Sequence, residues 1–192
     1  MSHSVRFVIS LLAPDEVGLL QRLSSTLTEL GGNIDGLSQT VIHGYCTLIM
    51  TVTFTQPVDD QRVDQAIAQA FDATRANWMV RPFESPRPQP EGAERYVLTL
   101  SGVDQPGILK MITSFLSGQG INIEDYYFSI QGPQVWHIAE LTIPAEIDVH
   151  ALQAEIQQMM KTLGLKASLQ HENLFRVTND VFSVRECLES QP

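Results

Sequence analysis

The stretch DEVGLLQRLSSTLTELGGNI at residues 15–34 recurs as DQPGILKMITSFLSGQGINI at residues 104–123. The two copies align without a gap, because every pair of aligned positions, such as Asp15 and Asp104, is separated by the same 89 residues (104 − 15 = 89). A chain of 192 residues is long enough for two small domains. The repeat therefore predicts that one domain occurs twice.

The composition is typical of a globular protein, with 43% hydrophobic and 18% charged residues. No apolar run approaches the roughly 18 residues that are needed to cross a membrane. The N-terminal apolar stretch is short and breaks at Pro14, so we expect no signal peptide. Cys46 and Cys187 have no metal or redox spacing. These features predict a reduced, cytoplasmic protein that does not contact a membrane.

The charge of the chain argues against nucleic acid as a partner. The sequence has 12 basic and 22 acidic residues, which gives a formal net charge of −10. Such a surface repels polyanions, and no basic stripe or helix-turn-helix pattern offsets the repulsion. We therefore expect no direct nucleic-acid binding.

Each copy begins with a strand and a helix. RFVISLL (residues 6–12) and RYVLTLS (residues 95–101) carry the β-branched and aliphatic residues of a buried strand. The segments that follow have apolar residues at spacings of three and four, which indicates an amphipathic helix, and glycines then end each helix. The apolar helix positions are Leu19, Leu20, Leu23, Leu27 and Leu30, and Ile108, Leu109, Ile112, Phe115 and Leu116; the glycines are Gly31, Gly32, Gly118 and Gly120.

Each copy continues with a hairpin, a second helix and a closing strand. The hairpins turn at His43 in the first copy and at Gly132 in the second, with alternating apolar residues on both sides. Asp59 and Asp148 are placed to begin the second helices. The order βαββαβ predicts an α+β fold of two ferredoxin-like units in tandem, each an antiparallel sheet with both helices on one face.

A proline-rich segment separates the copies. We assign the first domain to residues 1–81, a linker to 82–94, the second domain to 95–172 and a C-terminal extension to 173–192. The sequence leaves open whether the extension is an added strand, a short helix or a loose tail. It also leaves open whether the sheet face opposite the helices is solvated or shared with a partner.

The repeated motif resembles that of a known domain. A strand, D-x-x-G with two aliphatic residues, a helix, G-x-N-I and a hairpin resemble the ACT domain, and two copies in tandem resemble the glycine cleavage system transcriptional repressor family. Asp104, Pro106 and Gly107 match the motif, whereas Val17 replaces the usual proline in the first copy. The resemblance implies that an amino acid or similar metabolite binds at the junction of two units, between the first loop of one and the second strand of the other. Binding would regulate an associated protein.

The loop residues have the chemistry that such a ligand requires. Gly107 allows close approach, and the backbone N–H groups of Ile108 and Leu109 at the start of a helix can bind a carboxylate. Asp104 can accept from an ammonium group, and Asn122 can both donate and accept. We therefore predict a ligand-binding set in each copy. The members are Asp104, Gly107, Ile108, Leu109, Asn122 and Ile123 in the second copy, and Asp15, Gly18, Leu19, Leu20, Asn33 and Ile34 in the first.

A purely structural role for the same residues is the alternative. Asp15 and Asp104 would then cap their helices, and Asn33 and Asn122 would occupy strained turn positions. The sequence leaves both interpretations open.

Other residues that could carry chemistry are better explained by structure. The histidines have no metal-ligand spacing, and His137 is expected to be a partly buried, hydrogen-bonded imidazole in a strand. Tyr126 and Phe128 are expected in core or interface packing. Glu124 and Asp125 are adjacent in a strand and should point to opposite faces. The sequence lacks the phosphate-loop, dinucleotide and nucleophile-elbow motifs, so we expect no metal, no cofactor and no catalysis.

These observations predict a non-enzymatic regulatory protein that senses a small amino acid or related metabolite at the interface of two ACT units. Its effect would pass through a partner protein, in glycine cleavage or amino-acid metabolism, and the chain is a candidate homodimer. Two alternatives are kept. One is a ligand-independent interaction or dimerisation module; the other is an ACT-linked enzyme of the formyltetrahydrofolate deformylase type.

Overall fold

The computed structural model describes residues 4–86 and 88–178. The chain divides into two compact units, Met1–Pro86 and Arg87–Pro192, which we call unit 1 and unit 2. The division falls within the proline-rich segment between the repeats. Among the helices of the described residues, none is long and apolar enough to cross a membrane.

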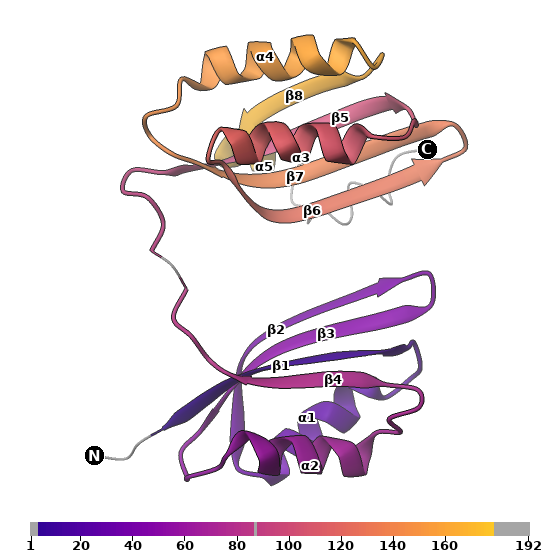
Figure 1. Cartoon of the computed structure of the whole chain (residues 1–192), viewed down its shortest axis with the longest axis vertical. Helices are drawn as coiled ribbons and strands as arrows, with labels where there is room; N and C mark the ends of the chain where they lie inside the picture. Colours follow the sequence, from indigo (N-terminus) through magenta and orange to yellow (C-terminus); the bar gives the residue numbers. More distant parts are fainter. Residues whose placement is uncertain (1–3, 87, 179–192) are drawn as a thin grey trace. The chain divides into compact units, whose positions relative to one another are not determined.

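Both units have the βαββαβ order that the sequence predicts (Figure 1). Unit 1 consists of β1 (Val5–Pro14), α1 (Leu19–Glu29), β2 (Gly32–Ile42), β3 (Tyr45–Phe54), α2 (Asp60–Ala70) and β4 (Asn77–Pro82). Unit 2 consists of β5 (Glu94–Val103), α3 (Ile108–Gly118), β6 (Asn122–Gln131), β7 (Gln134–Ile143), α4 (Val149–Lys161), β8 (Lys166–His171) and α5 (Glu172–Thr178). The sheets are antiparallel, with strand orders β2-β3-β1-β4 and β6-β7-β5-β8. The predicted fold class is confirmed.

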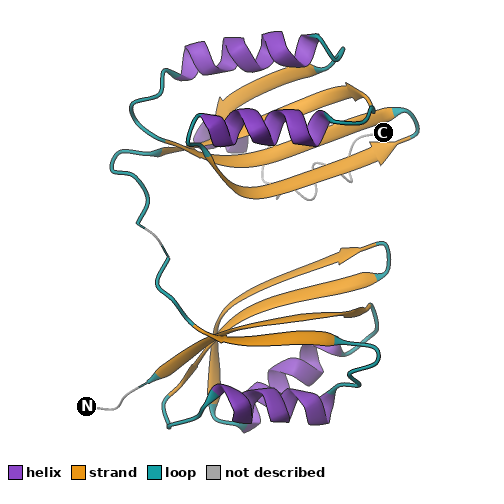
Figure 2. Cartoon of the chain, in the orientation of Figure 1, coloured by secondary structure: helices purple, strands orange, loops and turns teal. Residues whose placement is uncertain are grey.

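Each unit has its own hydrophobic core on one face of its sheet, which we call the inner face. In unit 1 the helices α1 and α2 cover this face (Figure 2). The core there contains Ile9 of β1, Leu23 of α1 and Met50 of β3. The counterparts in unit 2 are Leu98, Ile112 and Ala139. Burying a Leu, Ile or Met side chain contributes roughly 1.5–3 kcal/mol, so the inner faces account for much of the stability of the fold.

Helix starts and turns follow the sequence chemistry. Asp59 and Asp148 cap α2 and α4 through their side chains, as predicted. The turn between β2 and β3 has positive φ at His43 (48°) and Gly44 (80°), which a tight two-residue hairpin requires. Gly132, with a φ of 59°, occupies the turn between β6 and β7. The hairpins are therefore fixed by local backbone preferences.

The opposite faces of the two sheets, the outer faces, differ. In unit 2 the helix α5 lies on this face, where Phe175 packs with Val97 and Ile138 and all three are buried. In unit 1 the counterpart of Ile138 is Ile49, which is 51% exposed. The segment left open by the sequence is thus helical up to Thr178, and the rest of the predicted extension lies outside the described residues.

Candidate ligand-binding site

The loop between the first strand and the first helix has the same backbone in both units. Gly18 precedes α1 with φ 97° and ψ 0°, and Gly107 precedes α3 with φ 98° and ψ −6°. This left-handed conformation favours glycine. Neither helix start has a side-chain cap, so the alternative in which Asp15 and Asp104 cap these helices is wrong. The first-turn N–H groups therefore have no side-chain acceptor and are available to an anion.

The aspartate of each loop is fixed by the neighbouring hairpin turn. The backbone N–H of Asp15 donates to the carbonyl oxygen of Gly44 at 2.8 Å, and that of Asp104 donates to the carbonyl oxygen of Pro133 at 2.9 Å. Both aspartates are exposed. The backbone of each loop is thus anchored while its carboxylate can meet a ligand ammonium group.

A groove of about 580 Å³ lies at this loop in unit 1. Its volume is that of a small-molecule site. The structure brings Ser24 of α1, Gln39 of β2 and Cys46 of β3 to the same groove, and the sequence interpretation missed all three. The predicted residues that line it are Asp15, Gly18, Leu19 and Leu20.

The two missed strand residues stand on the inner face, where the pattern otherwise places apolar side chains. Gln39 lies across from the buried Leu48, so a polar residue at this alternating position was a signal in the sequence. Cys46 is 1% exposed. Its burial, together with the charge of Asp15, raises the pKa of the thiol, so the group stays protonated at neutral pH. Gln39 and Cys46 therefore add an amide and a neutral thiol to a groove that the carboxylates of Asp15 and Glu16 also line.

Asn33 supports a β-bulge at Asp35, not a strained turn. The register of β2 against β3 shifts at Asp35, whose carboxylate accepts hydrogen bonds from Asn33 Nδ2 at 3.1 Å and Thr53 Oγ1 at 2.5 Å. Arg6 Nε lies 3.1 Å from the same carboxylate. The hydrogen bond from Thr53, followed by those from Asn33 and Arg6, holds the pKa of Asp35 below its ordinary value. The predicted turn role of Asn33 is wrong because Asn33 lies in β2.

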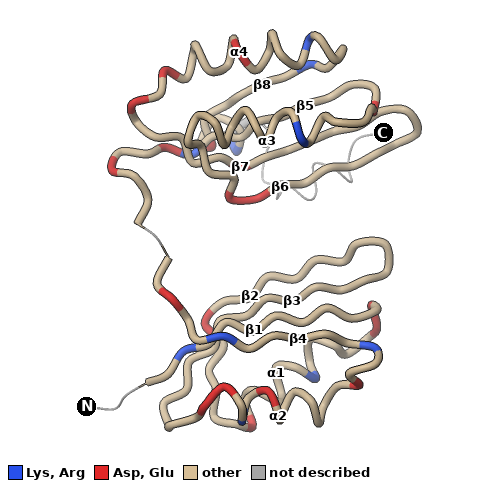
Figure 3. Tube along the Cα trace, viewed as in Figure 1, with Lys and Arg blue, Asp and Glu red and all other residues tan. Residues whose placement is uncertain are grey.

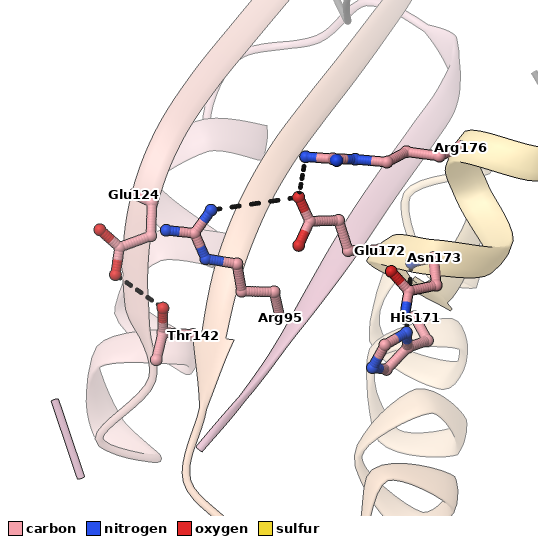
Figure 4. Close-up of polar contacts among 7 residues, drawn as sticks. All are labelled: Arg95, Glu124, Thr142, His171, Glu172, Asn173 and Arg176. Carbon is pink, nitrogen blue, oxygen red and sulfur yellow. Dashed lines mark hydrogen bonds and ion pairs between the residues drawn. The ribbon is translucent and has the colours of Figure 1, made fainter. Parts of the chain in front are cut away.

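The same arrangement recurs in unit 2 at Glu124, where the register of β6 shifts. Thr142 Oγ1 donates to Glu124 Oε1 at 2.7 Å (Figure 4). Asn122 Nδ2 donates to the same oxygen at 2.8 Å, and the two hydrogen bonds lower the pKa of Glu124. Asn122 is thus also a strand residue and not a turn residue. The phenol of Tyr127 donates to the carboxylate of Asp125, and Tyr127 lies on the outer face, as Thr142 does. The prediction that Glu124 and Asp125 point to opposite faces is therefore wrong, because the bulge breaks the alternation.

Within one unit, the predicted binding set is divided between the two ends of the sheet. Asn33 pairs with Thr53, which pairs in turn with Arg6 near the start of β1. Gly18 follows the end of the same strand. β1 has 10 residues, so at about 3.3 Å per residue the two ends lie roughly 30 Å apart. The residues on the side away from the loops are Asn33 and Ile34 in unit 1 and Asn122 and Ile123 in unit 2.

In unit 2 the strand residues beside the loop carry rings. Phe128 is the counterpart of Gln39, is 58% exposed and stacks on His137 with 5.9 Å between ring centroids. His137 is 6% exposed, and its Nδ1 lies 2.9 Å from Tyr126 Oη. Its Nε2 is buried and has no hydrogen-bond partner among the described residues. The expected hydrogen bond is therefore present at Nδ1, but the imidazole is more deeply buried than expected and is not fully satisfied. Burial lowers the pKa of His137 and raises the pKa of Tyr126 to about 12.

The helix α5 is attached to the outer face by charge as well as by Phe175. Arg95 Nη1 lies 4.0 Å from Glu172 Oε1, and Arg176 pairs with the same carboxylate (Figure 4). In unit 1 the counterpart of Glu172 is Phe83, on which the guanidinium of Arg6 stacks at 4.3 Å. In both units, the residue after the closing strand therefore contacts the arginine near the start of the first strand. The contact is an ion pair in unit 2 and a cation–π contact in unit 1.

The charged residues outside the loops and the bulges are the last candidates for a site. In the part of the chain that the structure describes, no three His, Cys, Asp or Glu side chains come together as metal ligands. The sequence has 22 acidic against 12 basic residues, and both kinds are found in each unit (Figure 3). The expectations of no metal and no nucleic acid stay predictions.

The fold and the loop define a class of protein: tandem βαββαβ units, each with a glycine loop that opens its first helix. The ACT domain models match residues 7–76 and 94–170. The chain therefore belongs to the ACT-domain family and contains two ACT domains in tandem.

Relatives and solved structures agree with this assignment. A UPF0237 protein of Methanopyrus kandleri is 31% identical over 88 residues, which are 45% of this chain and 98% of the relative. One of Methanococcus maripaludis is 31% identical over 43% of this chain and 93% of its own length. An unknown protein from Galdieria sulphuraria superposes with a TM-score of 0.76 at 18% identity, covering 88% of this chain and 99% of that one. A candidate glycine cleavage system transcriptional repressor superposes with a TM-score of 0.63 at 19% identity. The match covers 88% of this chain and 98% of the repressor. The last two comparisons establish the fold.

Proposed function

We propose that the protein is a non-enzymatic regulator that senses a small amino acid or a related metabolite. The observation that supports this most strongly is the groove at the loop of unit 1, where an uncapped helix start lies beside an exposed carboxylate. An amino acid has the complementary charges, a carboxylate for the helix start and an ammonium group for the aspartate.

Each loop residue has a role in this proposal. The N–H groups of Leu19 and Leu20 bind the ligand carboxylate, and Asp15 accepts from its ammonium group. Gly18 keeps the approach open, because the space where its Cβ would stand has no atom within 4 Å. The side chain of the ligand meets Gln39. In unit 2, Asp104, Gly107, Ile108 and Leu109 have the corresponding roles.

We also propose that the complete site forms at the junction of two ACT domains. The asparagine and isoleucine of each predicted set lie at the far end of their own sheet from the loop. Only a second ACT domain, from this chain or from another copy, can bring such a pair to a loop. Asn33 and Asn122 then contribute chiefly by fixing the bulged carboxylates of Asp35 and Glu124.

The signal is proposed to pass to a protein partner in the cytoplasm and to act on glycine cleavage or another part of amino-acid metabolism, including its transcription. Exposed apolar side chains on the outer face of unit 1, among them Leu12, Ile49 and Met79, support a protein partner. The net charge of −10 favours contact with a protein over contact with DNA. The same exposed face favours the second candidate function, a ligand-independent interaction module.

A thermal-shift screen of the full chain against the amino acids tests the proposal, since a ligand of the native state raises the melting temperature. Gly18→Ala should abolish the part of the shift that comes from ligand bound in unit 1, because the new methyl group stands in the groove. Gly31→Ala is the matched control: Gly31 also has positive φ (83°) and open space, but it follows the other end of α1. Both variants should be strained by about 1–2 kcal/mol. Absence of any shift with wild type, or equal shifts with both variants, would contradict the proposed site.

A further inference from the structure

His137 is a polar residue at a position that the fold fills with leucine elsewhere. Its counterpart in unit 1 is Leu48, which is completely buried. His137 is itself 6% exposed, and its Nε2 has no hydrogen-bond partner among the described residues. A buried polar atom without a partner destabilises the folded state. Because the duplicate fold forms with leucine at this position, the imidazole calls for an explanation beyond packing.

The hydrogen bond to Tyr126 defines what the imidazole offers. Burial raises the pKa of Tyr126 to about 12, so the phenol keeps its proton, and burial lowers the pKa of His137, so the imidazole is neutral at pH 7. Tyr126 Oη lies 2.9 Å from His137 Nδ1. We assign the tautomer in which the phenol O–H donates to Nδ1 and the imidazole proton is on Nε2. Tyr126 likewise corresponds to a leucine in unit 1, Leu37. The pair thus presents one buried N–H donor that lacks an acceptor.

The repeat locates this donor beside the loop of unit 2. Gln39 lines the groove of unit 1, and Leu48 lies directly across from it on β3. In unit 2 the corresponding partners are Phe128 and His137, whose rings are stacked. The carboxylate of Asp104 is close enough to act on the titration of His137. The imidazole therefore contacts Phe128 and interacts with Asp104, which are the counterparts of the groove residues Gln39 and Asp15 of unit 1.

We infer that His137, positioned by Tyr126, recognises a carboxylate-bearing ligand in unit 2, to which Nε2–H donates a hydrogen bond. The inference rests on the proposed function. Phe128 and Leu109 are 58% and 48% exposed, so the wall of this site is apolar and suits an amino acid with an apolar side chain. The groove of unit 1 is lined by Gln39 and Ser24 and suits a small polar amino acid such as serine. The two ACT domains thus select different ligands.

Calorimetric titration of the full chain with serine and with phenylalanine tests this inference. Wild type should bind both. His137→Leu, which copies Leu48 of unit 1, should weaken phenylalanine binding at least tenfold and leave serine binding unchanged. A melting temperature equal to or above that of wild type would show that the variant folds. His137→Gln, which keeps an N–H donor near the place of Nε2, should restore part of the phenylalanine affinity.

A spectroscopic measurement gives an independent test. In protein labelled with ¹⁵N-histidine, the His137 ring should have the Nε2–H tautomer, and its signals should shift with phenylalanine but not with serine. Tyr126→Phe, which removes the hydroxyl that fixes the tautomer, should weaken phenylalanine binding even if His137→Leu does not fold. Ring signals that do not change with phenylalanine, or full phenylalanine affinity in His137→Leu, would overturn the inference. If serine still bound in that case, the proposed function would be unaffected. Failure of wild type to bind any amino acid would overturn both.

Discussion

Ile49 and Ile138 occupy the same position of the repeat, but Ile49 is 51% exposed on unit 1 whereas Ile138 is 5% exposed beneath α5 of unit 2. The other side of the sheet differs as well, since Gln39 and Leu48 of unit 1 correspond to Phe128 and His137 of unit 2. The inner-face cores, by contrast, keep apolar residues at most aligned positions. The duplicated fold is therefore maintained by its cores, while the outer face and the groove are where the two units have diverged.

The largest expected effect is a difference in the free energy of unfolding between alanine variants of Ile138 and Ile49. Ile138→Ala should lower the free energy of unfolding of unit 2 by about 2–3 kcal/mol, because it leaves a cavity beneath Phe175. Ile49→Ala removes the same atoms from an exposed site and should cost unit 1 less than about 1 kcal/mol. Urea denaturation of the two variants measures both values. Equal losses would show that α5 does not protect the outer face.

A smaller effect is expected from the pH dependence of stability. The pKa of His137 is lowered by burial in the folded state, so below about pH 6.5 the unfolded chain binds the proton more readily and wild type loses stability. This loss of stability reaches at most about 1.4 kcal/mol at pH 5.5, and there is none at pH 8. His137→Leu should remove it, so its advantage over wild type should increase as the pH falls.

The measurement is a series of denaturation curves between pH 5.5 and pH 8. His150→Gln, at an exposed position of α4, is the control for removal of a histidine. An advantage of His137→Leu that does not change with pH would show that the imidazole of His137 is not held neutral by burial.

The smallest effect concerns the two bulges, where both units have the same chemistry. The hydroxyl of Thr53 is the largest cause of the lowered pKa of Asp35, so Thr53→Val should raise that pKa toward its ordinary value. Thr142→Val should do the same for Glu124. Each lowered pKa stabilises the fold above the ordinary carboxyl pKa, and this contribution is lost as the pH falls through the folded value. NMR titration of the side-chain carboxyl groups measures the changes, and unaltered values would contradict the assigned hydrogen bonds.

The sequence predicted the elements of the fold because the repeat showed each of them twice and the periods of apolar residues were clear. The prediction from the sequence failed where one extra residue interrupts the alternation of side chains along a strand. At Asp35 and Glu124 an extra residue enters the strand, which alternation does not reveal. The short helix α5 has seven residues and lies outside the repeat, so neither periodicity nor alignment defined it.

The candidate site was predicted in part. The sequence identified Asp15, Gly18, Leu19 and Leu20, all of which line the groove. It also assigned Asn33 to that set. Within unit 1 this residue lies at the other end of the sheet from the loop, so its place in a site completed by a second ACT domain stays a prediction. The sequence did not identify Gln39 of β2, which lines the same groove. A polar residue at an inner-face position, Gln39 in one copy and His137 in the other, was the available signal.

The most direct test of the proposed sensor is an NMR titration of the ¹⁵N-labelled full chain with serine. The account predicts that the backbone amide signals of Gly18, Leu19 and Leu20 shift most and saturate, while that of Gly31 at the other end of α1 stays in place. Serine that leaves every amide unmoved, or that shifts amides of the outer face and not those of the Gly18 loop, would contradict it.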